Sequence, residues 1–208
     1  MTRYSVGSGP EPQNGPAAFL RLWLGGLLHP GRSFDLLREK PAPYWGVAAI
    51  AVRWLGSALT TGLLSWLLDR PAVAPSYLTF LQTGAHPLAW RGLMLAFGVG
   101  VWLLMSALAH LLVRLAGQAS DFDRVLNIIG FGMLIPMPAV WLWDWTMLAL
   151  DIFQMPVMAV SHTLFQTWEA GLEALGLHRL LGIRWALAGA VALTINVLFI
   201  LLAMVFVR

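Results

Sequence analysis

Five stretches of the chain are apolar enough and long enough to cross a lipid bilayer as helices. A span needs about 20 mostly apolar residues, because about 30 Å of hydrocarbon is crossed at about 1.5 Å per helical residue. The stretches are residues 44–68, 89–116, 125–143, 145–168 and 185–207, all within residues 44–208. Only 11% of the residues are charged and 59% are hydrophobic, which excludes an ordinary soluble domain and a disordered chain. The sequence therefore predicts an all-α, polytopic membrane helix bundle with five transmembrane helices.

The third and fourth stretches are separated by a single residue, so the chain must reverse close to this point. A straight helix over residues 125–168 would be about 66 Å long, roughly twice the thickness of the hydrocarbon. Pro136 and Pro138 interrupt helical hydrogen bonding because proline has no backbone N–H group. We expect a tight hairpin around Trp143–Trp145, and a re-entrant loop that carries the two prolines is the alternative.

Positive charges are unevenly divided between the two sides of these spans. With five spans, nine arginine and lysine residues fall on the side of the N-terminus and three on the opposite side. The nine are Arg3, Arg21, Arg32, Arg38, Lys40, Arg114, Arg124, Arg179 and Arg184. Under the positive-inside rule the N-terminus is cytoplasmic and the C-terminus lies outside. The same rule accounts for the net positive charge, so no nucleic-acid partner is expected.

The region before the first span contains no stretch long enough to cross. Residues 1–15 are polar and rich in proline and glycine, which predicts a disordered tail. Residues 16–43 form an amphipathic, interfacial lead-in, whose first short helix carries Arg21 among apolar neighbours and ends at a His-Pro-Gly break. This lead-in is either a simple juxtamembrane connection or a surface that binds lipid or a partner.

The helix of the fourth span is expected to continue into the cytoplasm as an amphipathic segment. Trp168, Leu172 and Leu175 lie on one side of it by helical spacing. Glu169 and Glu173 lie on the other side, and a charge pair of this kind is typical of a helical face in water.

Two charged side chains lie inside predicted spans, where ionisable groups are rare and mark candidate functional sites. Arg53 would lie roughly 14 Å from the cytoplasmic edge, and Asp151 about 9 Å from the opposite edge. In a core of about 30 Å their levels differ by roughly 7 Å, within reach of an extended arginine. We predict an Arg53–Asp151 ion pair. A polar cavity for a solute or headgroup, and snorkelling to opposite surfaces, are the alternatives.

Five further polar residues are candidates for a polar face between the helices: His110, Arg114, Asn127, His162 and Asn196. His110 and Arg114 are one helical turn apart and share a face. Two histidines on different helices can ligate haem, but a single histidine near a helix end is typical of a hydrogen-bonding role. Asn127 and Asn196 are expected to bond between helices, and no cofactor is expected.

Motifs of known enzymes are missing from the sequence. It contains no Gly-x-Ser-x-Gly, no His-Glu-x-x-His and no glycine-rich phosphate loop. Cysteine is absent, which excludes disulfides, thiolate nucleophiles and iron–sulfur clusters. We therefore expect neither a metal site nor catalytic residues, and predict that the protein is not an enzyme.

Three segments carry a resemblance to a known family. Leu27-Leu-His-Pro-Gly-Arg-Ser-Phe-Asp-Leu-Leu-Arg-Glu-Lys-Pro stands directly before the first span, and Trp168-Glu-Ala-Gly-Leu precedes the last. Between them, His110-Leu-Leu-Val-Arg-Leu-Ala-Gly-Gln-Ala-Ser-Asp-Phe-Asp-Arg-Val-Leu-Asn-Ile-Ile-Gly-Phe is followed by Pro136. These segments resemble the bacterial Yip-domain family, relatives of the Rab/Ypt-interacting integral membrane proteins. The resemblance covers about residues 26–207 and implies the five-span plan in a bacterial inner membrane.

The small loops and the faces of small residues favour a non-enzymatic membrane protein of this type. We expect a scaffold or accessory subunit of a membrane complex, in contact with the lipid bilayer and with a membrane-protein partner or a second copy. The alternative is a small-solute or lipid transporter or binding bundle that uses Arg53 and Asp151.

Overall fold

The computed structural model describes residues 15–38, 44–68 and 87–206, which form helices and turns without a strand. The elements are α1 (Pro16–Leu28), α2 (Pro30–Leu37), α3 (Tyr44–Ser57), the π-helix η1 (Ala58–Gly62), α4 (Leu63–Leu67), α6 (Pro87–Leu115), α7 (Phe122–Leu134), α8 (Met137–Ala149), α9 (Met155–Leu181) and α10 (Trp185–Phe206). The all-α prediction is confirmed. The predicted disordered tail lies outside the described residues except for Gly15.

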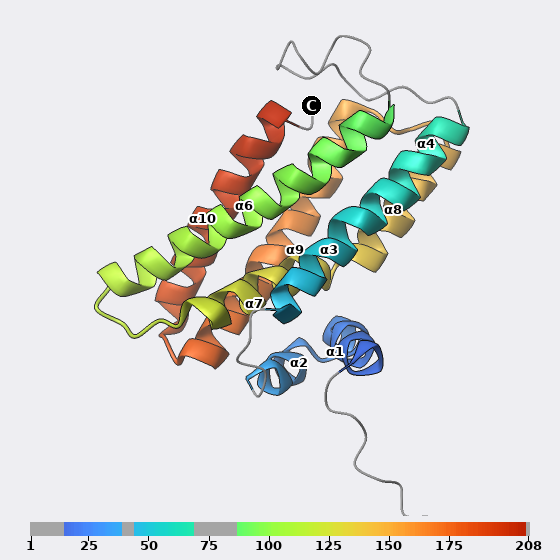
Figure 1. The fold of residues 1–208 in the computed structure, drawn as a ribbon. Coiled ribbons are helices and arrows are strands. Elements are labelled where there is room, and N and C mark those ends of the chain that lie inside the picture. Colours follow the sequence, from blue (N-terminus) through green and yellow to red (C-terminus); the bar gives the residue numbers. More distant parts are fainter. Residues whose placement is uncertain (1–14, 39–43, 69–86, 207–208) are drawn as a thin grey trace, which may run out of the picture.

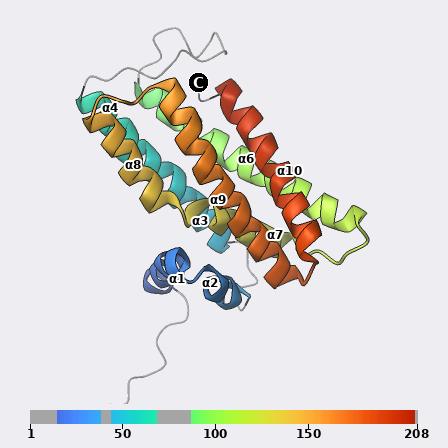
Figure 2. The same ribbon diagram turned by 180° about the vertical axis from the view of Figure 1, so that it is seen from behind.

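Long helices lie side by side and form the body of the molecule (Figures 1 and 2). The π-helix η1 continues α3 directly into α4, so these three elements make one segment, which packs against α6, α7 and α8. Three described stretches are long and apolar enough to cross a membrane: Leu95–Leu115, Phe122–Ala149 and Trp185–Val205. The α3–α4 segment and α9 are not among them, so the count of five spans stays a prediction.

The chain reversal lies later than predicted. Trp143–Trp145, the expected hairpin, are inside α8, and the chain turns back between α8 and α9, at residues 150–154. Asp151 has a left-handed backbone conformation in this turn, with a φ of 58°. Aspartate tolerates this conformation better than most residues because its short side chain can hydrogen-bond locally. The hairpin prediction is therefore wrong, and the fourth helix begins about ten residues later than expected.

The two prolines occupy the start of α8 and do not form a loop. Pro136 precedes the first residue of α8 and Pro138 lies in its first turn, a position where the missing N–H group is tolerated. The chain bends here, between α7 and α8, and α7 remains helical up to Leu134. A bend between two helices thus takes the place of the re-entrant loop.

Helix α7 is the most enclosed element of the fold. Every residue from Val125 to Leu134 is buried, and α3, α6 and α9 surround the helix. Gly46 of α3 and Gly130 of α7 allow their backbones to touch: a Cβ at Gly130 would lie 2.8 Å from the Cα of Gly46. Asn127 Oδ1 accepts a hydrogen bond of 2.7 Å from the backbone N–H of Gly46, which satisfies a donor in the first turn of α3.

Helix α1 lies across the end of the bundle and not along it. In Figure 1 it is seen down its axis, while the long helices run across the picture. Trp23 donates a hydrogen bond of 3.0 Å from Nε1 to the carbonyl of Leu134. That carbonyl is free for Trp23 because the residue four positions later, Pro138, has no N–H to offer it. Leu20 and Leu24 on the outer face of α1 are 47% and 49% exposed.

Helix α2 is attached to the C-terminal part of α9 by polar contacts. Arg179 Nη1 lies 2.6 Å from Asp35 Oδ2, and Arg38 Nη2 donates a hydrogen bond of 2.7 Å to the carbonyl of Arg179. Phe34 of α2 is buried against Gly176 of α9. The lead-in is therefore packed against the bundle through both of its helices.

Candidate functional site

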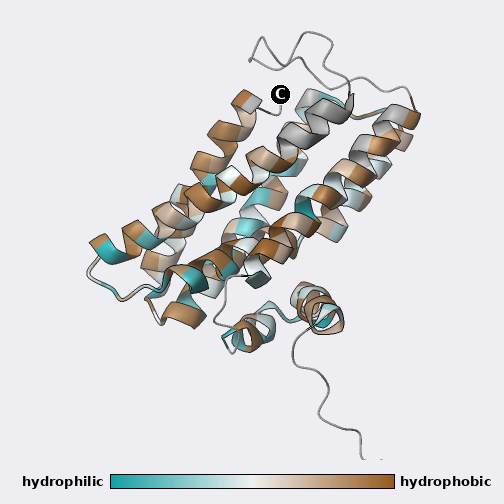
Figure 3. Ribbon diagram, viewed as in Figure 1, coloured by the Kyte–Doolittle hydropathy of each residue, from teal (hydrophilic) through white to brown (hydrophobic). Residues whose placement is uncertain are grey.

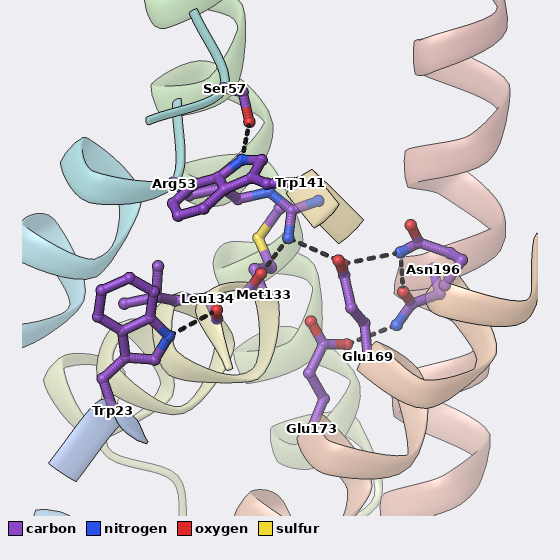
Figure 4. A network of polar contacts seen from close by, with 10 residues as sticks. Trp23, Arg53, Ser57, Met133, Leu134, Trp141, Glu169, Glu173 and Asn196 are labelled. Carbon is purple, nitrogen blue, oxygen red and sulfur yellow. Dashed lines mark hydrogen bonds and ion pairs between the residues drawn. The ribbon is translucent and has the colours of Figure 1, made fainter. Parts of the chain in front are cut away.

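Polar side chains from three helices meet inside the bundle (Figure 4). Arg53 comes from α3, Gln166, Glu169 and Glu173 from α9, and Asn196 from α10, and all five are buried. We call this group the buried polar cluster. Its members lie far apart in the sequence, so only the packing of the helices brings them together.

Helical spacing explains the contribution of α9. Gln166, Glu169 and Glu173 are three and four residues apart, which places them on one face of the helix. His162 lies one turn before Gln166 on the same face. This polar face points into the bundle, with Glu169 2% and Glu173 0% exposed. The prediction that both glutamates face water is therefore wrong.

Arg53 is the centre of the cluster. Its Nη1 lies 2.7 Å from Glu169 Oε1 and also donates a hydrogen bond to the backbone carbonyl of Met133. The carbonyl of Met133 is available because α7 ends beside it at the bend. The guanidinium also lies 5.7 Å from the ring centroid of Trp54 and 5.8 Å from that of Phe199. These contacts satisfy the charge of Arg53, which is buried in the bundle.

Two amide side chains connect the carboxylates across the interface between α9 and α10. Gln166 Nε2 donates to Asn196 Oδ1 and, at 3.3 Å, to Glu169 Oε2. Asn196 Nδ2 donates to Glu173 Oε2 and, at 2.8 Å, to the carbonyl of Ala192 in its own helix. The amides thus form a bridge between the Arg53–Glu169 pair and Glu173.

Glu173 is the less satisfied of the two glutamates. Its Oε2 accepts from Asn196, whereas its Oε1 has no hydrogen-bond partner among the described residues. The side chain also packs tightly, since a Cβ at Gly132 would lie 2.5 Å from its Cγ. The cluster therefore combines one guanidinium with two carboxyl groups, and only one of these carboxyl groups contacts the guanidinium.

The predicted Arg53–Asp151 pair is replaced by the Arg53–Glu169 pair. Asp151 is exposed in the turn after α8, because α8 ends at Ala149 and the residue is no longer within a helix. The predicted depth of Asp151 depends on a span that begins at residue 145, whereas α9 begins at Met155. The prediction that Arg53 is a buried polar residue with an acidic partner holds, but the partner is on α9.

The five residues of the predicted polar face are dispersed over separate contacts. His110 Nδ1 lies 2.9 Å from Ser120 Oγ, and Arg114 is exposed at the end of α6. Asn127 caps the start of α3, as described above. His162 Nε2 lies 3.3 Å from Asp144 Oδ1, which links α9 to α8. Only Asn196 belongs to the buried polar cluster.

Sequence reasoning missed Gln166, Glu169 and Glu173. Their common face, continued by His162, was visible as helical spacing, but Trp168 and Leu172 define an apolar face of the same helix. The polar face is buried in the bundle, whereas Trp168 on the apolar face is 38% exposed. The sequence of one helix does not show which of its faces the neighbouring helices cover.

The chemistry that this arrangement offers is electrostatic and hydrogen-bonding. Within the described ranges, no group of three or more histidine, aspartate or glutamate residues is placed to hold a metal ion. Charged groups buried among helices are expected to fix helix position and register.

The helices and their packed polar interior define the class of the protein. Among the described residues, three helical stretches are long and apolar enough to cross a membrane, which makes the protein an integral membrane helix bundle. The model of the Yip1 domain family matches residues 24–207, so the chain belongs to the Yip1 domain family, as predicted. No curated protein and no solved structure matches the chain.

Proposed function

We propose that this Yip1 domain protein is a non-enzymatic scaffold or accessory subunit of a membrane complex. The observation that carries the proposal is that the buried polar side chains form bonds between helices. Arg53, Glu169 and Asn196 are each bonded to a residue of another helix. Side chains committed in this way hold helices in a fixed arrangement, which is what a protein that positions neighbours in a membrane requires.

The outer faces of the bundle support contact with lipid and with other membrane helices. Exposed apolar residues follow one another at helical spacing along α10: Leu193, Val197, Leu201 and Met204. Figure 3 shows the apolar colouring along the long helices. Such a surface suits lipid tails and equally suits the apolar face of a partner helix or of a second copy.

We further propose five spans in a bacterial inner membrane, with a cytoplasmic N-terminus and an external C-terminus. Helix α2, the turn between α6 and α7, and the turn between α9 and α10 gather at one end of the bundle (Figure 1). Exposed arginines lie at this end: Arg32, Arg38, Arg114, Arg179 and Arg184. The positive-inside rule assigns such an end to the cytoplasm.

A photo-crosslinking experiment in native membranes tests the scaffold role. A photoreactive amino acid at Leu193 or Leu201 is expected to give discrete protein adducts, with a partner or a second copy, because both side chains project from the bundle. The matched control is Ile195 on the same helix, which is fully buried and should give no adduct. Co-purification in a mild detergent should then retain the crosslinked protein at a fixed stoichiometry.

The outcome that contradicts the scaffold role is equally defined. Lipid adducts alone at every exposed position of the bundle, with a bound solute or lipid recovered from the purified protein, would favour a transporter or lipid-binding bundle. That alternative rested on the Arg53–Asp151 pair, which the Arg53–Glu169 contact replaces.

A further inference from the structure

We propose that the buried polar cluster is a binding site for one proton, which is held on the carboxyl group of Glu173. The inference goes beyond the scaffold role, because it gives the interior of the bundle a ligand. It rests on the charges in the cluster, on the burial of both glutamates and on the unpartnered oxygen of Glu173.

The charges in the cluster do not balance if both glutamates are ionised. Arg53 supplies one positive charge, and its Nη1 lies 2.7 Å from Glu169. Glu173 stands one helical turn from Glu169, so its Cβ is about 5–6 Å away from that of Glu169. Gln166 and Asn196 are neutral amides and bring no charge. A second carboxylate would leave one negative charge without a counter-ion in a site of low dielectric constant, and a group in this position takes up a proton.

The hydrogen bonds indicate which carboxyl group carries the proton. Glu169 accepts from Arg53 and from Gln166, and both contacts favour its ionised form. Glu173 accepts one bond, from Asn196, and its Oε1 has no partner among the described residues. An O–H bond on Oε1 therefore displaces no existing contact.

The helices packed around Glu173 present no further cation to it. Gly132 is the residue of α7 that meets its side chain, and Asn196 is the polar residue that α10 contributes. Other charged groups on these elements pair away from Glu173. On α7, Arg124 pairs with Asp121; on α9, His162 pairs with Asp144; between α2 and α9, Asp35 and Arg38 bond to Arg179. Among the described residues, Arg53 is thus the cation in contact with the cluster, while His162, paired with Asp144, lies farther along the same face of α9 and interacts electrostatically with Glu169.

A proton suits this site better than a metal ion. Cations such as Ca²⁺ take six to eight oxygen ligands in an open cage, as a general rule. Here the Cγ of Glu173 is packed against Gly132, and the amide oxygen of Asn196 already accepts from Gln166. A proton needs only the lone pair that Glu173 Oε1 offers.

The proton affects how α9 and α10 hold together. Its loss would place a second negative charge beside Glu169 and remove the balance with Arg53. Since Glu173 binds a proton in the folded protein and releases it at neutral pH in an unfolded chain, stability should fall as the pH rises. The unfolding equilibrium constant of the wild type should rise by up to tenfold per pH unit relative to Glu173→Gln.

Infrared difference spectroscopy on the full chain in lipid tests the proposal. The C=O stretch of a protonated carboxyl group is expected in the wild type near neutral pH. It should persist in Asp144→Asn, which removes another buried carboxyl group, and it should disappear in Glu173→Gln. Thermal unfolding adds a second readout: Glu173→Gln should be more stable than the wild type at neutral pH, because glutamine resembles a neutral glutamate and takes up no proton on folding. Glu169→Gln strands Arg53 and should raise the unfolding equilibrium constant by about a hundredfold or more.

Several results would overturn the proposal. The first is the absence of the protonated-carboxyl band in the wild type, which needs no variant to fold. The second is a loss of stability in Glu173→Gln as large as that in Glu169→Gln, since this would show that Glu173 is ionised. A stabilisation by sodium or potassium salts that vanishes in Glu173→Gln would assign the site to a monovalent cation instead.

Discussion

The Arg53–Glu169 pair makes the sharpest energetic prediction of the structure. Replacing Glu169 by Gln leaves the buried guanidinium of Arg53 without its counter-ion, and breaking a buried pair in this way typically costs about 3–5 kcal/mol. Replacing Arg53 by Met leaves Glu169 uncompensated and also frees the carbonyl of Met133. An unsatisfied buried acceptor adds about 1–3 kcal/mol, so Arg53→Met should be the more damaging single change.

The double variant separates the pair from its surroundings. A buried ion pair often breaks even against neutral replacements, so Arg53→Met with Glu169→Gln should lose only the Met133 contact, about 1–3 kcal/mol. The coupling energy of the cycle, the sum of the two single losses minus the loss in the double variant, is then about 6 kcal/mol or more in favour of the pair. Reversible unfolding in mixed detergent micelles measures the wild type, the two single variants and the double variant. Additive losses in the two single variants would refute the pair.

Two further predictions follow from the packing of the helices. Gly130→Ala should destabilise the fold by about 1–3 kcal/mol, because the added Cβ meets the backbone of Gly46, whereas Gly189→Ala faces open space and should be neutral or stabilising; equal melting temperatures would contradict the close contact of α3 and α7. Leu20→Ser with Leu24→Ser should leave the melting temperature near that of the wild type and expose α1 to protease in membranes, because both leucines project outward. Unchanged cleavage would mean that these leucines do not anchor α1.

The helical architecture could be predicted from the sequence because it depends on local composition. Apolar stretches of sufficient length identify membrane helices without knowledge of their neighbours. The same reasoning failed between Pro136 and Asp151. A proline near the start of a helix and a proline in a turn have the same local signature, and packing against Trp23 and α7 decides between them.

Only part of the candidate site could be predicted from the sequence. Arg53 stood out because a charge inside an apolar stretch has few explanations. Its partner could not be found from depth alone, because the depth of a residue in the membrane depends on where its helix starts. The sequence predicts a helix over residues 145–168, whereas Asp151 lies in the turn between α8 and α9. Glu169 and Glu173 were assigned to water because a helix with a charged face and an apolar face is usually half exposed. Here α10 covers the charged face with Asn196.

Single-cysteine labelling tests most directly whether this chain spans the membrane in the proposed orientation, since the native sequence has no cysteine. Ala119 lies in the exposed turn between α6 and α7, and Gln154 in the exposed turn between α8 and α9, at the opposite end of the bundle. In intact cells, an impermeant thiol reagent should label Gln154→Cys at once, and Ala119→Cys only after the membrane is permeabilised. Equal labelling of both positions from outside, or labelling of Ala119→Cys alone, would contradict the proposed arrangement.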